Sequence, residues 1–278
     1  MSFIRAVRMG LPALGALVMV TMLSTPAWAQ DPPVVVVTGG LDFTNQYNFR
    51  GIRQNTEGVS IWPYVDFGFT PFRGDGGLKT VGLNLGTWNA FHSQINEDDF
   101  GTDNKWYESD LYATLGFGFS KASLGFTYTS YTSPADLFAH VKELAVKLSI
   151  DDSARMGKGA LKPYALVAFE LTDDGQADAG DEKGTYIELG VAPGFAGSRA
   201  SVAVPIKIGL SGSDYYEFGS GEDETFGYFS VGAMVTVPLG AHANIHGGGE
   251  FQVFGDTVKA YNGQDSAGLA VIGLGFAF

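Results

Sequence analysis

The residues of this sequence best suited to chemistry are charged side chains that stand two positions apart in otherwise apolar runs. Glu108 and Asp110 do so in the run 106–119, and Glu188 follows Tyr186 in the same way in a later run. Because successive side chains of a β-strand point to opposite faces, such residues share one face and the apolar residues take the other. Carboxylates on a face that lines a water-filled space raise the local concentration of cations and disfavour anions.

Eleven charged residues fall on the inward face when this alternation is followed along the chain, and ten of them are predicted to line the pore. These predicted pore-lining residues are Arg50, Asp66, Glu108, Asp110, Glu143, Lys147, Glu170, Glu188, Lys207 and Glu250. With Asp42 included, the inward face carries eight acids and three bases, so one-to-one pairing leaves several acids without a basic partner. A buried, unpaired carboxylate is costly, which favours a hydrated lumen. The alternative is a packed polar plug, in which the acids pair with the bases and with tyrosine hydroxyls.

The elements that must position these residues are twelve amphipathic β-strands, separated by glycine, asparagine, aspartate and serine. The predicted strands are 38–50, 58–72, 78–93, 106–119, 122–132, 138–151, 160–172, 184–195, 199–211, 225–238, 242–255 and 266–278. The last strand ends the chain on Phe278 and carries large apolar side chains on one face. A strand of this length can cross a bilayer at a tilt. The pattern predicts an all-β fold, a membrane-spanning antiparallel up-and-down β-barrel of about twelve strands.

The lengths of the connections predict the orientation of this barrel. Membrane barrels have short periplasmic turns and longer extracellular loops. With both ends periplasmic, the long connections 94–105 and 173–183 lie outside and the short connection 120–121 lies inside. Connections 133–137 and 152–159 break the alternation, the first by being short and the second by being long. A soluble β-sandwich would share the alternating faces, but it would not explain the asymmetry of the connections.

This orientation predicts that most of the inward carboxylates lie in the extracellular half of the lumen. They are Glu108, Asp110, Glu143, Glu170, Glu188 and Glu250. Arg50 is predicted to end the first strand at the same rim, and the loops look too short to form a deep plug. Eight strands leave an interior filled by side chains and sixteen leave an aqueous channel, so twelve predict a narrow or partly occluded pore.

The ends of the chain and its charge predict where the protein resides. Residues 1–29 are predicted to be a signal peptide and residues 30–278 the barrel, because Arg5 and Arg8 precede the apolar run 11–23 and Ala27-Trp28-Ala29 fits a cleavage site. Export and a barrel fold together predict the bacterial outer membrane. The mature chain has 15 basic and 30 acidic residues, which argues against nucleic-acid binding. The chain has no cysteine, hence no thiolate metal site, and no cofactor is predicted.

Enzymatic and metal sites find little support in the sequence. His92 and His140 have candidate serine partners, but neither pair carries the glycine elbow of a lipase-type site, so an enzyme is not expected. His242, His246 and Glu250 recur at four-residue spacing. On a strand, residues four apart lie about 13 Å from one another, which is too far to share one ion.

Two segments resemble known proteins. Gly273, Phe276 and Phe278 resemble the C-terminal signal of bacterial outer-membrane barrels, which implies recognition by the barrel-assembly machinery through Phe276 and Phe278. The segment 41–55, followed by 61–67, resembles the opening of the TorF-type family of porins. The matching residues there are Tyr47, Phe49, Arg50, Gly51 and Gln54, whereas Arg53 replaces a small polar residue. The second resemblance implies an outer-membrane channel of poorly defined substrate.

We therefore expect a channel for small hydrophilic solutes with a cation-biased lumen, surrounded by outer-membrane lipid and lipopolysaccharide. One alternative is a closed structural or adhesive barrel whose acidic loops, such as 97–99 and 222–224, bind partners or divalent ions. Another is an outer-membrane lipid hydrolase that uses His92.

Overall fold

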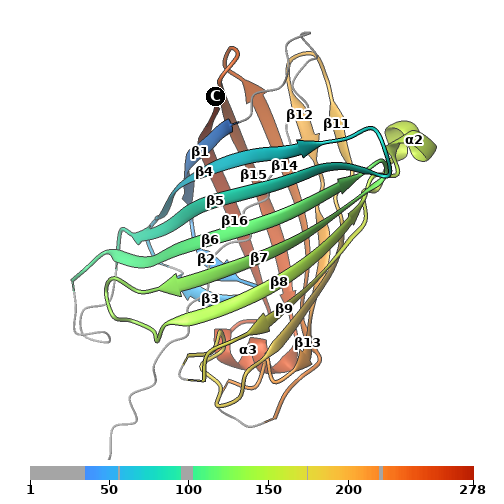
Figure 1. The fold of residues 1–278 in the computed structure, drawn as a ribbon. Coiled ribbons are helices and arrows are strands. Elements are labelled where there is room, and N and C mark those ends of the chain that lie inside the picture. Colours follow the sequence, from blue (N-terminus) through green and yellow to red (C-terminus); the bar gives the residue numbers. More distant parts are fainter. Residues whose placement is uncertain (1–34, 56, 95–102, 174, 219–221) are drawn as a thin grey trace, which may run out of the picture.

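The chain folds into a single closed β-barrel (Figure 1). The computed structural model describes residues 35–55, 57–94, 103–173, 175–218 and 222–278. The predicted signal peptide 1–29 and the acidic run 97–99 lie outside these residues. The twelve strands of the barrel wall are β1 (Val35–Thr44), β4 (Ser60–Arg73), β5 (Leu78–His92), β6 (Trp106–Phe119), β7 (Ala122–Thr132), β8 (Val141–Ile150), β9 (Tyr164–Glu170), β10 (Thr185–Val191), β13 (Ile206–Ser213), β14 (Phe226–Pro238), β15 (Ala243–Phe254) and β16 (Ser266–Ala277).

The wall is antiparallel throughout and closes between its first and last strands. Gly39 of β1 pairs with Phe276 of β16, so the sheet has no free edge at this seam. Two short strands, β11 (Gly194–Ala196) and β12 (Ser201–Ala203), continue β10 and β13 beyond Pro193 and Pro205. Proline lacks the N–H that a ladder requires, which explains both interruptions. The predicted fold class and the number of strands are confirmed.

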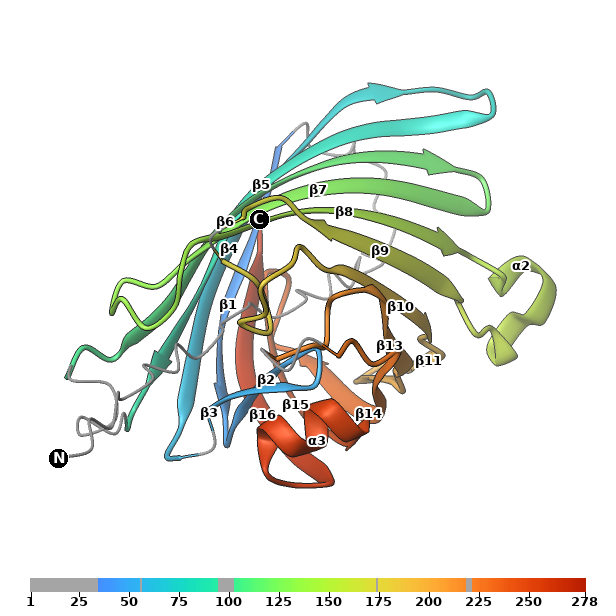
Figure 2. The same cartoon turned by 90° about the horizontal axis from the view of Figure 1, so that it is seen from below.

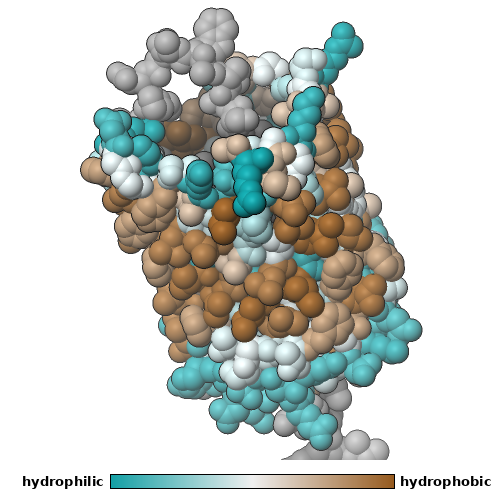
Figure 3. Space-filling view, turned by 90° about the vertical axis from the view of Figure 1, so that its right-hand side faces the viewer, coloured by the Kyte–Doolittle hydropathy of each residue, from teal (hydrophilic) through white to brown (hydrophobic). Residues whose placement is uncertain are grey.

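The outward face of the wall is apolar. Leu111 is 63% exposed and Ile272 57% exposed, and both lie in the alternating register that the sequence predicts for the lipid face. Figure 3 shows the result as a band of hydrophobic residues around the middle of the molecule, with hydrophilic residues toward its ends. Such a band is the surface that a membrane barrel presents to lipid.

The first predicted strand, 38–50, is wrong in its second half. β1 ends at Thr44, and the chain then leaves the wall to form a separate two-stranded sheet of β2 (Tyr47–Phe49) and β3 (Ile52–Asn55). Figures 1 and 2 show this hairpin inside the barrel, and we call it the luminal hairpin. Asn45 marks the departure point, since its side chain exchanges hydrogen bonds with Gly268 and Ala270 of β16.

Local chemistry explains why these residues do not continue the wall. A wall strand needs one face for lipid, yet all three residues of β2 are buried. Arg50 and Gly51 at the hairpin turn have φ of 48° and 85°, and positive φ at both central positions is the signature of a tight two-residue hairpin turn. The aromatic residues of 47–49 therefore pack into the barrel interior instead of facing the membrane.

The two ends of the barrel differ in how they are covered. We call the end with the start of β1 and the end of β16 the periplasmic end, following the predicted orientation. At the opposite, extracellular end, α3 (Asp256–Asn262) and the loops 171–184 and 214–218 lie over the luminal hairpin (Figure 2). The expectation that the extracellular segments are too short to form a plug is thus wrong, because several short segments fill the space jointly.

The helices are short. Besides α3, they are α2 (Ser153–Met156) and the 3-10 turn η1 (Gly157–Gly159), which follow each other in the connection between β8 and β9 at the periplasmic end. In the described part of the chain, no helix has the length and apolarity that crossing a membrane would require.

Candidate functional site

The candidate site is the barrel lumen, which is packed in its extracellular half. Five of the predicted inward carboxylates are almost completely buried there, with exposed fractions between 0% and 5%. They are Glu108, Asp110, Glu143, Glu170 and Glu188. They contact the luminal hairpin, loop backbone and tyrosine hydroxyls. This half of the lumen therefore matches the alternative given by the sequence, a packed polar plug.

Arg50 is the central cation of the packed half. It lies at the turn of the luminal hairpin, and not at the end of a wall strand as the sequence suggested. Its guanidinium binds both oxygens of Glu143, at 2.6 and 2.8 Å, and also donates a hydrogen bond to the hydroxyl of Tyr215 at 2.8 Å. The ring of Tyr186 lies beneath it, 4.1 Å from Cζ to the ring centroid. This bidentate ion pair fastens the hairpin to β8.

Glu170 and Glu188 are satisfied without a cation partner. Glu188 accepts hydrogen bonds from the hydroxyls of Tyr164, Tyr186 and Tyr228, at 2.7 to 3.0 Å. Glu170 accepts hydrogen bonds from two backbone N–H groups of the following loop, those of residues 177 and 184. The first carboxylate organises the wall, and the second holds loop 171–184 over the lumen.

Glu108 and Asp110 form the least satisfied part of the packed half. Tyr47 of the luminal hairpin donates its hydroxyl to Glu108 Oε2 at 3.0 Å. Within the described part of the chain, Glu108 Oε1 and Asp110 Oδ1 are buried and have no hydrogen-bond partner. Both carboxylates lie on β6, so their side chains would face the lumen directly if the hairpin were withdrawn.

The periplasmic half of the lumen is open by comparison. Inward glycines such as Gly116 and Gly125 have free space where a Cβ would stand, with the nearest atoms 3.9 and 3.8 Å away. The Lys207–Glu250 pair lies at mid-height of the wall, since Glu250 pairs with Gly232 in the middle of β14. Its two charged groups are 3.4 Å apart, with side-chain exposures of 13% and 22%. Small residues on the inward positions are what leave this half unfilled.

The remaining two predicted residues stand at the border between the halves. Asp66 is 4% exposed and accepts hydrogen bonds from Asn84 at 2.8 Å and from the hydroxyl of Tyr112 at 2.7 Å. The ammonium of Lys147 lies 4.3 Å from the centroid of the Tyr164 ring. Among the described residues Lys147 forms no ion pair. Of the six carboxylates predicted for the extracellular half, five lie together in its packed part, and Glu250 lies at mid-height beside Lys207.

Sequence reasoning missed the aromatic residues of the lumen. Tyr112 lies against Gly86 of the neighbouring strand and Tyr164 against Gly190, so a side chain at either glycine would collide with a ring. These rings lie flat on the wall because glycine leaves the space for them. The signal is a tyrosine paired near a glycine on the adjacent strand, and it can be read only when the register between strands is known.

The loops above the lumen are also held together by a buried acid. Asp178 accepts hydrogen bonds from the backbone N–H groups of Gly180, Glu217 and Phe218, at 2.7 to 2.9 Å. Burial raises the pKa of Asp178 to about 6, because desolvation of the carboxylate outweighs these hydrogen bonds. Loops 171–184 and 214–218 are therefore joined by a group whose charge changes near neutral pH.

The neighbours of three histidines bear on the hydrolytic and metal-binding alternatives. His92 is buried in the lumen and its Nδ1 lies 2.8 Å from Ser60 Oγ, while its Nε2 has no partner. His140 Nε2 lies 2.8 Å from Ser130 Oγ at an exposed position. His246 lies 2.8 Å from Asp42, and within the described ranges no three potential metal ligands cluster.

Comparisons with known proteins bear on the fold. No protein-family model matches this chain, and neither does any curated protein. Among solved structures, an outer membrane channel from Pseudomonas putida F1 is 11% identical with a TM-score of 0.50, over 91% of this chain and 99% of its own. The outer membrane phospholipase A of Escherichia coli is 11% identical with a TM-score of 0.46, over 86% and 92%. The NanC porin is 12% identical with a TM-score of 0.42, over 87% and 98%. At such low identity the likeness concerns the fold alone, and that fold is the outer-membrane β-barrel.

Proposed function

We propose that this protein is a channel of the bacterial outer membrane that passes small hydrophilic solutes. The observation that carries the proposal is the contrast between the apolar outer face of the barrel and its polar, charged and half-open lumen. A barrel with only a structural role has no need of a lumen lined by glycine and charged side chains. The similar fold of an outer membrane channel agrees with this function.

Conduction requires the luminal hairpin to move, because it fills the extracellular half in the arrangement described above. Among the described residues, β2 and β3 form no ladder with the wall, so side-chain contacts hold the hairpin in place together with its two chain connections. The strongest of these contacts is the Arg50–Glu143 ion pair. We propose that the hairpin is the gate of the channel.

The expected cation bias belongs to the open state of this gate. When the hairpin withdraws, Arg50 leaves with it and Glu143 loses its counter-ion. The wall then presents Glu108, Asp110 and Glu143 to the solute path. Carboxylates on a water-filled path attract cations and disfavour anions, so the open pore should prefer cations.

Planar-bilayer recording in a salt gradient tests this proposal. The wild-type channel should show a reversal potential of the sign for cations. The variant Glu108→Gln/Asp110→Asn/Glu188→Gln should fold and show a smaller reversal potential, because the amides keep the shape and remove the charge. A matched control is Asp173→Asn/Asp181→Asn/Asp265→Asn, which removes three charges from exposed loop residues. An anion-selective wild-type pore, or none at all, contradicts the proposal.

A second candidate function is a closed structural or adhesive barrel, and the packed extracellular half favours it. Its acidic loops would then bind partners or divalent ions. A liposome-swelling assay separates the two functions, because only a channel admits sugars or amino acids. Swelling that declines with solute size supports the channel, whereas no swelling with any solute supports the closed barrel.

We do not propose an enzyme. The Ser60–His92 hydrogen bond lies in the lumen, and no carboxylate or amide orients the imidazole through Nε2, which has no partner. A triad-type site requires such an orienting group. Phospholipid hydrolysis by the wild type that disappears in His92→Ala would overturn this view.

The route to the membrane forms part of the proposal. Residues 1–29 would direct export and be removed, and the barrel-assembly machinery would read Phe276 and Phe278 at the end of β16. These rings are 38% and 66% exposed on the outward face, where another protein could reach them. Outer-membrane lipid and lipopolysaccharide would surround the apolar band. Membership of the TorF-type family rests on the segment 41–55 and stays a prediction.

A further inference from the structure

The connection between β8 and β9 is unusual for the periplasmic end of a barrel. Turns at this end are short in membrane barrels, and here the β6–β7 connection spans only two residues. The β8–β9 connection runs over residues 151–163 and contains α2 and η1. We call residues 151–163 the basic turn. A channel does not require this long connection, so the connection needs a separate explanation.

The basic turn is a built structure. The carboxylate of Asp152 accepts hydrogen bonds from the backbone N–H groups of Leu161 and Lys162, at 3.0 and 2.9 Å, and so closes the base of the turn. These two hydrogen bonds keep the pKa of Asp152 below its usual value. The carbonyl of Leu161 also accepts a hydrogen bond from the backbone N–H of Ala192, which ties the turn to the next hairpin. The backbone at the base of the turn therefore has a defined path.

The basic turn combines cations with exposed apolar side chains along its length. Arg155, Lys158 and Lys162 are all exposed. Between them, Met156 is 50% exposed and Leu161 is 46% exposed. Residues 153–163 contain these three cations and no acid, because both acids of the turn, Asp151 and Asp152, precede them; the whole turn has a net charge of +1. Cations beside exposed apolar residues are characteristic of segments that lie in the interface of a membrane.

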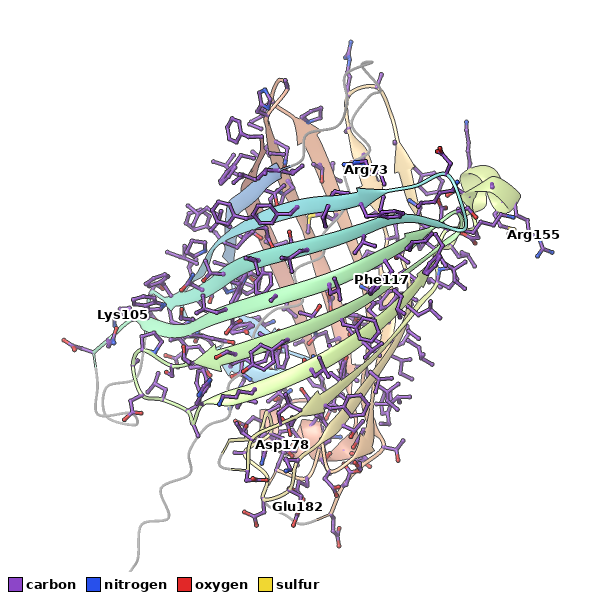
Figure 4. The ribbon with its side chains drawn as sticks, in the orientation of Figure 1. Arg73, Lys105, Phe117, Arg155, Asp178 and Glu182 are labelled. Carbon is purple, nitrogen blue, oxygen red and sulfur yellow. The ribbon has the colours of Figure 1, made fainter. Side chains whose placement is uncertain are left out.

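The position of the turn fits that interface. Figures 1 and 2 show α2 projecting sideways beyond the barrel wall at the periplasmic end. Figure 4 shows Arg155 pointing away from the barrel. The outward residues Phe119 and Ile150, each 45% exposed, end strands β6 and β8 next to the turn. The turn that carries Met156 and Leu161 thus follows directly on β8, whose outward apolar face ends at Ile150.

We propose that the basic turn docks on the anionic headgroups of the phospholipid leaflet at the periplasmic side of the membrane. Met156 and Leu161 enter the boundary between headgroups and acyl chains, and Arg155, Lys158 and Lys162 bind lipid phosphates. Cations near an anionic membrane surface attract it electrostatically, which accounts for the cations of the turn. This inference rests on the proposed location of the barrel in a membrane, but it does not depend on whether the barrel conducts.

Tryptophan fluorescence with brominated lipids tests the proposal on the full-length mature barrel in vesicles. The reporter is Met156→Trp, and Leu239→Trp is its control. Leu239 is 53% exposed at another periplasmic turn, 239–242, which contains no lysine or arginine. Each variant is compared with the wild type in vesicles whose brominated lipid is either phosphatidylglycerol or phosphatidylcholine at equal mole fraction.

The expected result is strong quenching of the Met156→Trp reporter, about twofold stronger by brominated phosphatidylglycerol than by brominated phosphatidylcholine. Adding Arg155→Gln/Lys158→Gln/Lys162→Gln should make the two lipids equal, as they should be for Leu239→Trp. An unquenched reporter with a water-exposed emission maximum overturns the proposal and leaves the turn available to a soluble periplasmic partner. Lipid preference that survives the triple substitution also overturns it.

The wild-type tryptophans distinguish a turn that does not dock on lipid from a barrel that has not inserted into the membrane. Trp106 lies on the outward face and is 39% exposed. If the barrel inserts, wild-type fluorescence is quenched by either brominated lipid. If wild-type fluorescence is unquenched, the barrel has not entered the bilayer and the proposed function fails first.

Discussion

The two halves of the lumen are built by the same strands and differ in almost every other respect. The extracellular half is filled by the luminal hairpin and the loops above it, and its carboxylates are buried in ion pairs and hydrogen bonds. The periplasmic half has inward glycines, such as Gly116 and Gly125, at which a Cβ would meet nothing closer than 3.8 Å. Strand number alone would make both halves equally wide. The difference therefore comes from a segment that the wall does not need.

This contrast shows that the charge of a lumen and its accessibility are separate properties. Glu143 is as much a wall residue as Lys207, and both point inward. Glu143 is 2% exposed because Arg50 and the hairpin cover it, whereas Lys207 stays partly open beside Glu250. The pore-lining role of the buried residues depends on the position of the hairpin, so experiments that release the hairpin are the most informative.

The largest effect is expected from Arg50→Met. This change leaves Glu143 as a buried charge without a partner, which costs about 3–5 kcal/mol. Displacement of the hairpin relieves this cost. We therefore expect the single-channel conductance to rise and the hairpin to lose protection from hydrogen exchange. Arg50→Met/Glu143→Gln is the control, because it removes both charges and should restore much of the protection. A folded Arg50→Met barrel with wild-type conductance and protection would show that this ion pair does not hold the gate.

A smaller effect is expected from adding one methyl group in each half. Gly227 lies against the ring of Tyr216 in the packed half, so Gly227→Ala forces the ring to move, at about 1–3 kcal/mol. Gly116 faces open space, and Gly116→Ala should leave the stability unchanged or slightly raised. Urea unfolding of the refolded barrel measures both variants. Equal losses of stability would mean that the periplasmic half is as tightly packed as the extracellular half.

The smallest effect concerns pH and the loops of the packed half. The pKa of Asp178 is raised to about 6, above the ordinary value of 3.8, so protonation favours the docked loops. Docking should be strongest below about pH 4 and weaken as the pH rises to about 6, with no further change above that range. Hydrogen exchange of the Phe218 amide, corrected for its intrinsic rate, should be roughly tenfold more protected at pH 4.5 than at pH 7. Asp178→Asn should abolish this dependence, and a dependence that persists must come from another group.

The wall of the barrel could be predicted from the sequence because its pattern is local. Strands 106–119 and 122–132 have the predicted bounds, since alternation of side chains and turn residues requires only neighbouring positions. The hairpin could not be predicted in this way. Residues 47–49 alternate no worse than a wall strand, and only their burial on both faces distinguishes them. That burial depends on residues more than sixty positions away, such as Glu108 and Glu143.

The candidate site was predicted in its composition and not in its contacts. Inward charges follow from the period of two, so the chemical identity of the lumen could be predicted. Which of them are paired depends on register, loop packing and the path of residues 45–58. Arg50 illustrates this limit, because the turn at Gly51 brings it to Glu143 on β8, 93 positions along the chain.

A twelve-stranded barrel with an apolar outside and a charged inside follows from local pattern, because these properties arise from side chains that alternate along each strand. The packing of one half of the lumen and the openness of the other follow from contacts between residues far apart in the chain. A hairpin of nine residues, Tyr47–Asn55, turns inward because its aromatic residues and one arginine find partners on distant strands, and no local pattern specifies those partners.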